Sequence, residues 1–451
     1  MPSPTPISGF PEWLPAERIA EQQVLDTLRE VFELHGFASI QTRAVEPLDQ
    51  LLRKGDTSKE VYTLRRLQAE SDEADDGSST LGLHFDLTVP FARYVLENSG
   101  KLQFPFRRYQ IQPAWRGERP QEGRYREFVQ ADIDVIDKDA LSFHYEVEIA
   151  QVIAEVFARL PLPPVRLQVN NRKLIEGYYR GLGIEDADDV MRVVDKVDKI
   201  GAAGVEKTLV EDLGLGAEQA RACVALAEVV GDAGSIRSQI AALGVQHPLL
   251  DEGVDELVRV LEGTSGLGTD TFTVVADLAV ARGLDYYTGT VYETRMAGFE
   301  HLGSICSGGR YDALASDGRT TYPGVGISLG VSRALGPLFA RGLLTASRST
   351  PTCVLVALPS EDDRAASGLI AAALRARGIA AEVSPTAPKY GKQIRFAERR
   401  GIPYLWFPQE DGSHQVRDIR SGEQVDADPA AWVPPAEDLR PSIIGTAAES
   451  G

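Results

Sequence analysis

Two β-like runs at residues 104–137 enclose a loop rich in arginine. The runs are FPFRRYQIQPAW and EFVQADIDVID, and the loop between them is RGERPQEGRYR. Two apolar, aromatic-rich runs joined in this way predict neighbouring antiparallel strands. The alternation in DIDVI places Asp132 and Asp134 on one face of the second strand and Ile133 and Val135 on the other. The two carboxylates fit a polar cavity and solvent equally well.

Length and composition limit the classes of protein that the chain can belong to. With 451 residues, of which 43% are hydrophobic and 25% charged, it is expected to fold into two or three domains. No window has the roughly 18–20 apolar residues that a membrane span needs. The first residues lack the basic flank and apolar stretch of a secretory signal, so a cytoplasmic location is expected. A net charge of −19 argues against general coating of nucleic acid, although a local basic face could still bind one, because distant charges are screened.

The cysteines and histidines show no pattern of a metal site. Cys223, Cys306 and Cys353 are scattered, without the spacing of zinc ligands, and are interpreted as small buried residues. The six histidines are equally dispersed, so the sequence predicts no protein-bound metal. There is also no G-x-x-x-x-G-K-[ST] loop and no dinucleotide-binding glycine motif.

Changes in pattern divide the chain into five parts. β-like runs predominate in the first and third parts, and the second has the Ala, Leu, Val and Glu content of helices. The fourth alternates β-α-β-α-β, which predicts a mainly parallel sheet, and the fifth is a tail that is expected to be partly disordered. LLTASRSTP is expected to be a linker. The parts are residues 1–170, 171–265, 266–342, 350–430 and 431–451.

Several arginines stand at strand edges or beside glycines: Arg116, Arg282, Arg310 and Arg333. The guanidinium group is permanently charged and matches phosphate or carboxylate with a fork of donors. Converging arginines on an antiparallel sheet could therefore hold a triphosphate without a P-loop. Ion pairs with some of the 66 acidic residues are the other interpretation that each arginine allows.

Four segments resemble the class II aminoacyl-tRNA synthetases in the form found in histidyl-tRNA synthetases. FRRYQIQPAWRGERPQEGRYREFVQADIDV resembles motif 2, and GVGISLGVSRAL resembles motif 3. RGLDYYTGTVYE and SGGRYDAL resemble the two histidine signatures. HFDLTVPFARYV and GKQIRFAERRGIPYLWF also match, so the resemblance covers about residues 8–425.

The resemblance implies an α+β fold, in which an antiparallel catalytic sheet carries a helical insertion and is followed by an α/β anticodon-binding domain. It implies that ATP and histidine form histidyl-adenylate and that the histidyl group then passes to the 3′ end of tRNA(His). Mg²⁺ would bind through the nucleotide phosphates. A homodimer is also implied, with no membrane or DNA partner.

The same resemblance assigns residues to ATP. Arg116 would hold the α-phosphate and the histidine carboxylate, while Glu118 and Phe128 would contact the adenine. Arg333 would cover the other face of that ring and reach the γ-phosphate. Arg282 would stand beside the α-phosphate, so that Arg116, Arg282 and Arg333 form the catalytic set.

The histidine site is assigned in the same way. Asp86, Thr88 and Gln130 would bind the α-amino group, and Asp134 and Tyr287 would read the imidazole. A neutral imidazole offers one donor and one acceptor, which suit a phenol and a carboxylate. Tyr286 would support this geometry, and both Arg116 and Arg282 would approach the bound amino acid. Without the resemblance, these residues could equally be exposed carboxylates and core aromatics.

Two basic groups are candidates for tRNA binding. One consists of Arg119 and Arg124 in the motif 2 loop. The other is Lys389, Lys392 and Arg395, in a helical stretch of the fourth part that the resemblance makes the anticodon-binding domain. A solvated amphipathic helix explains the second group equally well on charge alone.

Some positions depart from the family pattern. Arg43 stands where motif 1 normally has a proline, so the dimer is implied by the family and not by that residue. Ser332 replaces the usual glutamate before the motif 3 arginine. Asp86 and Asp134 are often glutamate in bacterial members, whereas aspartate is typical of the eukaryotic and archaeal subgroup.

Two other functions fit part of the sequence. A non-catalytic relative that binds histidine as a regulator would share the fold, but such relatives tend to lack the C-terminal domain and the catalytic signatures. A class II synthetase for another amino acid would share motifs 2 and 3. RGLDYYTG argues against it.

Overall fold

The structure is a computed structural model that describes residues 5–52, 60–65, 80–280 and 286–445. Contacts divide the chain into two compact units. The first contains residues 1–11 and 25–337, and the second contains residues 12–24 and 338–451. The five-part division made from the sequence stays a prediction. No described helix is long and apolar enough to cross a membrane.

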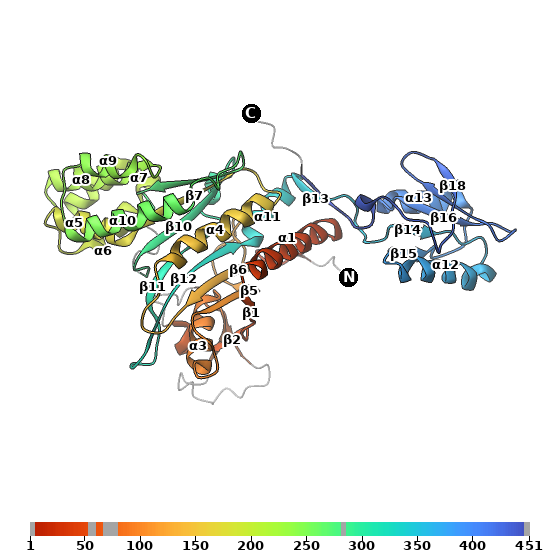
Figure 1. The fold of residues 1–451 in the computed structure, drawn as a ribbon, viewed down its shortest axis with the longest axis horizontal. Helices are drawn as coiled ribbons and strands as arrows, with labels where there is room; N and C mark the ends of the chain where they lie inside the picture. The colour runs from red at the N-terminus through yellow and green to blue at the C-terminus, as the bar shows by residue number, and fades with distance from the viewer. Residues whose placement is uncertain (1–4, 53–59, 66–79, 281–285, 446–451) are drawn as a thin grey trace. The chain divides into compact units, whose positions relative to one another are not determined.

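A 9-stranded sheet forms the centre of the first unit (Figure 1). Its strands pair antiparallel except for β1 with β5 and β7 with β9. The predicted hairpin is present, with Phe106 opposite Ile136 and Trp115 opposite Glu127. In spatial order the strands are β1 (Ala38–Ser39), β5 (Phe106–Trp115), β6 (Glu127–Ile136), β12 (Thr321–Gly330), β11 (Cys306–Ser316), β10 (Thr290–Met296), β7 (Val165–Asn171), β9 (Phe272–Asp277) and β8 (Val230–Gly231).

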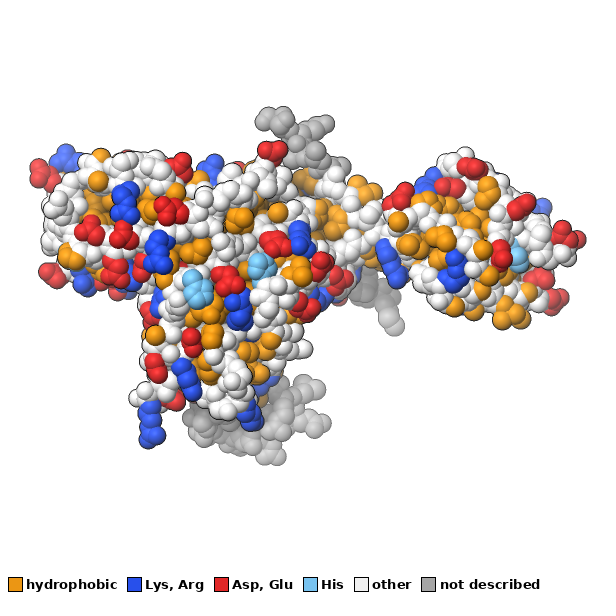
Figure 2. All heavy atoms as spheres, in the orientation of Figure 1, with side chains coloured by type: hydrophobic (Ala, Val, Ile, Leu, Met, Phe, Trp, Pro, Cys, Tyr) orange, Lys and Arg blue, Asp and Glu red, His pale blue; other side chains and the backbone are white. Residues whose placement is uncertain are grey.

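The first unit also contains nine described helices that lie between its strands in sequence, from α2 to α10. The predicted helical stretch after β7 is confirmed, and it starts where the Asn171 side chain accepts hydrogen bonds from the backbone N–H groups of Lys173 and Leu174. Figure 2 shows acidic and basic side chains mixed on the visible face of this stretch, which is typical of a solvated surface. The helices are α2 (Leu48–Leu51), α3 (Thr88–Asn98), α4 (His144–Arg159), α5 (Arg172–Gly181), α6 (Ala187–Val194), α7 (Val197–Glu211), α8 (Ala217–Ala227), α9 (Ile236–Ala242) and α10 (Pro248–Gly263).

One core cluster fixes α3 on the sheet. Phe91 and Val95 of α3 pack with Ile136, Tyr311 and Tyr322, which come from β6, β11 and β12. Ile136 lies on the same face of β6 as Asp132 and Asp134, because these positions are two residues apart. The apolar end of that face therefore anchors the helix whose start carries Thr88. A small sheet of β2 (Val45–Pro47), β4 (Leu81–Leu83) and β3 (Thr63–Leu64) precedes α3, and η2 (Glu300–Leu302) precedes β11.

The second unit has the predicted β-α-β-α-β order. Its 5-stranded sheet has parallel β15, β14 and β16, and antiparallel β17 and β18 extend it. The run CVLVAL is apolar throughout because both faces of β14 are buried: Val354 and Val356 face one cluster, and Leu355 faces another. The elements are β14 (Val354–Val356), η3 (Glu361–Asp363), α12 (Arg364–Ala376), β15 (Ala381–Val383), α13 (Tyr390–Arg400), β16 (Tyr404–Pro408), β17 (His414–Asp418), β18 (Gln424–Asp426) and η4 (Ala436–Asp438).

The expected linker LLTASRSTP is not an unstructured connection. It contains β13 (Leu344–Ala346), which pairs antiparallel with β19 (Ile443–Gly445) from the expected tail. Arg348 in the same stretch is buried and donates to the backbone oxygens of Thr350 and Asp438. Neither the pairing of β13 with β19 nor the contacts of Arg348 can be predicted from the neighbouring sequence. The helices α1 (Pro15–Leu34) and α11 (Val331–Ala340) each have residues in both units.

The three cysteines are buried and free, as interpreted from the sequence. Burial raises the pKa of all three thiols above its usual value. Within the described ranges, no group of three or more His, Cys, Asp or Glu side chains could hold a metal ion.

Candidate functional site

Polar side chains alternate along one face of β6. Gln130, Asp132 and Asp134 are each no more than 9% exposed. The neighbouring strands β5 and β12 place one residue on each side of every one of these three side chains. The residues opposite them are Gln112, Gln110 and Arg108 on β5, and Gly330, Ser328 and Gly326 on β12.

The glycines of β12 leave space above this face. A Cβ at Gly326 would lie 2.0 Å from Asp134 Oδ1, and one at Gly324 would lie 2.6 Å from Tyr311 Oη. Because both positions lack a side chain, the Tyr311 hydroxyl on β11 reaches across β12 and donates to Asp134 Oδ1 at 2.7 Å. At Gly324 and Gly326, no side chain of β12 fills the space between Asp134 and Tyr311.

Asp134 has a cation supplied by the protein. Arg108 Nη2 lies 2.6 Å from Asp134 Oδ2, and the Arg108 side chain is fully buried, with its guanidinium carbon 4.2 Å from the centre of the Phe91 ring. A buried charge is stable in a folded protein when an opposite charge and hydrogen bonds compensate for its lost hydration. Arg108 and Tyr311 provide this compensation for Asp134.

Asp132 lies in a different electrostatic environment. Its side chain accepts a hydrogen bond from Ser328 Oγ, and burial raises its pKa to about 7, although Arg108 and this hydrogen bond act in the opposite direction. The nearby Asp134 and Asp86 raise the pKa further. The two neighbouring carboxylates therefore differ in their partners: Asp134 has an arginine in direct contact, whereas Asp132 has a serine hydroxyl.

A narrow pocket of about 30 Å³ opens at this point. Its lining includes Thr88, Asp132, Asp134, Tyr286 and Tyr287. The rings of Tyr286 and Tyr287 lie 5.0 Å apart in an edge-to-face arrangement, and burial raises the pKa of both phenols. Both are therefore neutral hydrogen-bonding groups at physiological pH.

Asp86 lies near this pocket without lining it. Its Oδ1 accepts a hydrogen bond from Val89 N at 3.1 Å in the first turn of α3. Its charge contributes to the raised pKa of Tyr287. Six described residues were assigned from the sequence to histidine alone, and the structure brings them together: Asp86, Thr88, Gln130, Asp134, Tyr286 and Tyr287.

A second cavity, of about 150 Å³, adjoins the first, because Ser307 and Ser328 line both. The Arg116 guanidinium lies 5.1 Å from the centre of the Phe128 ring, and Arg116 Nε donates to Phe85 O at 3.0 Å. Arg333 donates to the backbone oxygen of Leu302. The residues assigned to ATP that line this cavity are Arg116, Glu118, Phe128 and Arg333.

Other predicted residues fall elsewhere. Arg282, with the remainder of 281–285, lies outside the described residues. Arg310 bonds Glu146 at 2.9 Å and Asp312 at 3.1 Å, so its interpretation as an ion-pair partner is confirmed. In the motif 2 loop, Arg124 lines the second cavity, 3.6 Å from Glu118, whereas Arg119 is exposed and does not line it.

Two of the departures from the family pattern, Ser332 and Arg43, have local partners. Ser332 is buried, and its Oγ accepts a hydrogen bond from Val129 N at 2.9 Å, which ties the start of α11 to β6. Arg43 is exposed over half of its side chain and pairs with Glu46 at 3.0 Å. Serine at position 332 thus satisfies a backbone donor of the strand that carries Gln130.

The basic group of the second unit lies on and just before α13. Lys389, Lys392 and Arg395 are exposed. Arg400, further along the helix, pairs with Glu382 and donates to Thr350 Oγ1, so it serves the fold of that unit. The exposed cations agree with a solvated face and are available to a polyanion.

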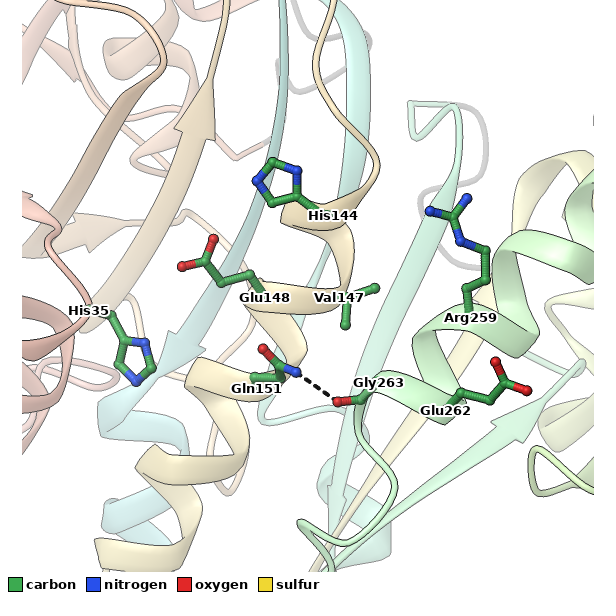
Figure 3. A pocket seen from close by; sticks show the side chains of 8 residues that line it. All are labelled: His35, His144, Val147, Glu148, Gln151, Arg259, Glu262 and Gly263. Atoms are coloured by element: carbon green, nitrogen blue, oxygen red, sulfur yellow. Dashed lines mark hydrogen bonds between the residues drawn. The ribbon is translucent and has the colours of Figure 1, made fainter.

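A third and larger pocket, of about 660 Å³, lies between α4 and α10 (Figure 3). Three of its polar side chains have partners: Glu148 pairs with Arg107, His35 pairs with Glu155, and Gln151 donates to Gly263 O at 2.7 Å. The Arg259 guanidinium lies 4.1 Å from the centre of the Phe143 ring. None of the residues predicted for chemistry lines this surface pocket.

Four residues of the site were not assigned from the sequence: Arg108, Asp132, Tyr311 and Ser328. The alternation in DIDVI did place Asp132 beside Asp134, and Tyr311 stands inside SGGRYDAL. Arg108 and Ser328 carry no signal of their own. Their importance depends on pairing between strands.

Comparison with known proteins agrees with the site. A family model described as "Histidyl-tRNA synthetase" matches residues 9–334. The "Histidine--tRNA ligase" of Cutibacterium acnes is 55% identical over 98% of this chain and 99% of its own, and that of Micrococcus luteus is 55% identical over 97% and 98%.

Structural comparison gives the same result. The crystal structure of histidyl-tRNA synthetase from Nostoc sp. PCC 7120 is 34% identical, covers 94% of this chain and 96% of its own, and has a TM-score of 0.83. The α+β fold expected from the resemblance is confirmed. The chain belongs to the histidyl-tRNA synthetase family.

Proposed function

We propose that this protein is a histidine–tRNA ligase, which activates histidine with ATP and transfers it to the 3′ end of tRNA(His). The observation that carries this proposal is the junction of two cavities at Ser307 and Ser328. One is lined by carboxylates and phenols, and the other by arginines and an aromatic ring. The names of the relatives at 55% identity support the same activity.

In the first cavity the imidazole of histidine would meet Asp134 and Tyr287. Asp134 is held by Arg108 and Tyr311, so its position is fixed before the ligand arrives. Thr88, Gln130 and Asp86 would lie toward the α-amino group. An apolar side chain would leave these buried polar groups without partners, which gives selectivity without an editing step.

In the second cavity ATP would lie between Phe128, which stacks on the adenine, and Arg333, which covers its other face and reaches the γ-phosphate. Glu118 would contact the adenine edge. Arg116 would face the α-phosphate and the carboxylate of histidine. Mg²⁺ would arrive bound through the outer phosphates, where it neutralises their charge, and no protein ligand is assigned to it.

The first step joins the two cavities. A carboxylate oxygen of histidine attacks the α-phosphorus, and the bond to pyrophosphate breaks as the acyl–phosphate bond forms. Negative charge concentrates on the α-phosphate, where Arg116 and Arg282 would stabilise it. A hydroxyl of the terminal adenosine of the tRNA then attacks the acyl carbon, and AMP leaves.

Binding of tRNA would use Arg119, Arg124, Lys389, Lys392 and Arg395, and the protein would act as a homodimer. The second candidate, a histidine-binding regulatory relative, is less well supported. The chain keeps Arg116 and Arg333 at one cavity, and it has the C-terminal unit that such relatives tend to lack.

Exchange of labelled pyrophosphate into ATP, with each of the twenty amino acids in turn, tests the proposal. We expect exchange with histidine and none with the others. Exchange with another amino acid alone would contradict the specificity. Binding of histidine without exchange would favour the regulatory relative.

A further inference from the structure

The two buried carboxylates of β6 differ in how their charge is compensated. Asp134 has Arg108 at 2.6 Å, whereas no lysine, arginine or histidine among the described residues forms an ion pair with Asp132. Asp132 is 3% exposed and lines the narrow pocket. A buried carboxylate in this position is stabilised by a proton or by a cation beyond the ion pairs that the described residues form.

Asp132 also controls the direction of a neighbouring amide. The Ser328 hydroxyl has one hydrogen, which it donates to Asp132, so its oxygen accepts from Gln130 Nε2 at 2.8 Å. The Gln130 carbonyl oxygen must then point elsewhere. It is buried and has no hydrogen-bond partner in the described structure, and Gln130 lines the larger cavity.

The junction of the cavities therefore presents a carboxylate with no ion pair among the described residues and an unused carbonyl acceptor. A carboxylate or a phosphate would be repelled there, and a neutral imidazole has only one N–H to donate. A primary ammonium group has three N–H donors and the missing positive charge. It is the part of an amino acid that meets both demands.

We propose that Asp132 is the counter-ion of the α-ammonium group of the amino-acid substrate and that, through Ser328, it sets the Gln130 amide to accept from the same group. This rests on the proposed function and adds a specificity-determining residue to it. Asp132 would distinguish ligands by their amine, while Asp134 would distinguish them by their imidazole.

The charges around Asp132 are consistent with this role. Arg108 on β5, Asp134 on β6, Asp86 before α3, Tyr287 before β10 and Cys306 on β11 all interact with it electrostatically. Burial raises the pKa of Asp132 to about 7, so near neutral pH the ligand-free site is partly protonated. An incoming ammonium would replace that proton.

Binding of three ligands to the full chain, measured by isothermal titration calorimetry, tests the proposal. Histidine has the ring, amine and carboxylate; histamine lacks the carboxylate; imidazole propionate lacks the amine. In Asp132→Asn we expect the Kd of histidine and of histamine to rise by about 10–100-fold, the range for losing a charged hydrogen bond. The Kd of imidazole propionate should stay within about twofold of the wild-type value.

Two further variants complete the test. Asp139→Asn changes an exposed aspartate just beyond β6 and should leave all three Kd values unchanged. Ser328→Ala keeps the carboxylate and removes the link to Gln130. It should weaken histidine and histamine less than Asp132→Asn does and spare imidazole propionate. Should Asp132→Asn fail to fold, this selective loss in Ser328→Ala would support the proposal, and its absence would overturn it.

The remaining outcomes separate this proposal from the proposed function. Equal weakening of histamine and imidazole propionate in Asp132→Asn would show a structural role only and would overturn the inference. Unchanged Kd values in that variant, with normal binding and exchange by the wild type, would overturn it alone. Failure of the wild type to bind histidine would overturn both.

Discussion

The Tyr311 hydroxyl donates a hydrogen bond to Asp134 at 2.7 Å across an intervening strand. Side chains of next-nearest strands rarely meet, because the strand between them fills the space with its own side chains. Here Gly324 and Gly326 of β12 leave that space empty. The contact joins the second histidine signature to motif 2 across a strand of motif 3.

Gly326→Ala tests the need for this space. The new Cβ would lie 2.0 Å from Asp134 Oδ1, so the carboxylate must move away from Tyr311 and the imidazole site. We expect the KM for histidine in pyrophosphate exchange to rise at least about tenfold, as for a lost charged hydrogen bond, while the KM for ATP stays near its original value. Gly368→Ala on α12, where a Cβ meets nothing within 4 Å, is the control. An unchanged KM for histidine would contradict the steric argument.

Asp132→Asn should change how stability depends on pH. The folded-state pKa of about 7 lies above the unfolded value near 4, so the contribution of Asp132 to stability falls as the pH rises from about 4 to about 7. Asparagine does not ionise. Without ligand, the Tm of the variant relative to the wild type should therefore be higher at pH 8 than near pH 4, with most of the change between these two values. Differential scanning fluorimetry across this range measures the difference, and a constant offset would contradict the assigned pKa.

Arg310→Met should lower stability and leave chemistry intact. The change leaves the buried Glu146 without its arginine, which typically reduces the free energy of unfolding by about 3–5 kcal/mol. Urea unfolding measures this loss. Exchange below the unfolding transition should be close to normal, because Arg310 lines neither cavity. Lost exchange with unchanged stability would return Arg310 to the candidates for phosphate binding.

Arg282→Ala should slow the chemical step and leave stability unchanged. If Arg282 stabilises the α-phosphate, single-turnover formation of adenylate should slow by about 10²–10³-fold, the typical effect of removing one such donor. Its unfolding midpoint should equal that of the wild type. A near-normal rate would refute the role implied by the family resemblance.

Lys392→Gln combined with Arg395→Gln should separate the two steps of the reaction. Loss of two cations from α13 should weaken tRNA binding and reduce aminoacylation, most strongly at low salt, and leave pyrophosphate exchange unchanged. Arg364→Gln with Arg375→Gln removes two exposed charges from α12 and serves as the control. Equal loss in both double variants would show a general effect of charge and not a binding face.

The sequence predicted many of the strands and helices because these depend on local periodicity. The alternation in DIDVI and the fully apolar CVLVAL are such local signals, and both strands are present. Periodicity could not predict which arginines form ion pairs within the protein and which line a cavity. Arg310 is paired by Glu146, which lies far away in sequence, whereas Arg116 remains at a cavity.

The site shows the same limit. Periodicity assigned Asp132 and Asp134 to one face of a strand but could not say what covers that face. The residues beside these carboxylates are the glycines and Ser328 of β12, and only Asp134 has an ion pair with Arg108 of β5. The strand in LLTASRSTP was missed for a similar reason, since its partner is near the end of the chain.

The position of β12 between β6 and β11 also has a consequence during synthesis on the ribosome. β6 ends at Ile136, but β12 starts only at Thr321, so Asp132 and Asp134 leave the ribosome long before Ser328 and Tyr311 exist. Until then both carboxylates are hydrated and histidine has no pocket to enter. A free amino acid can therefore stabilise only a chain whose first unit is complete, and it cannot rescue a truncated one.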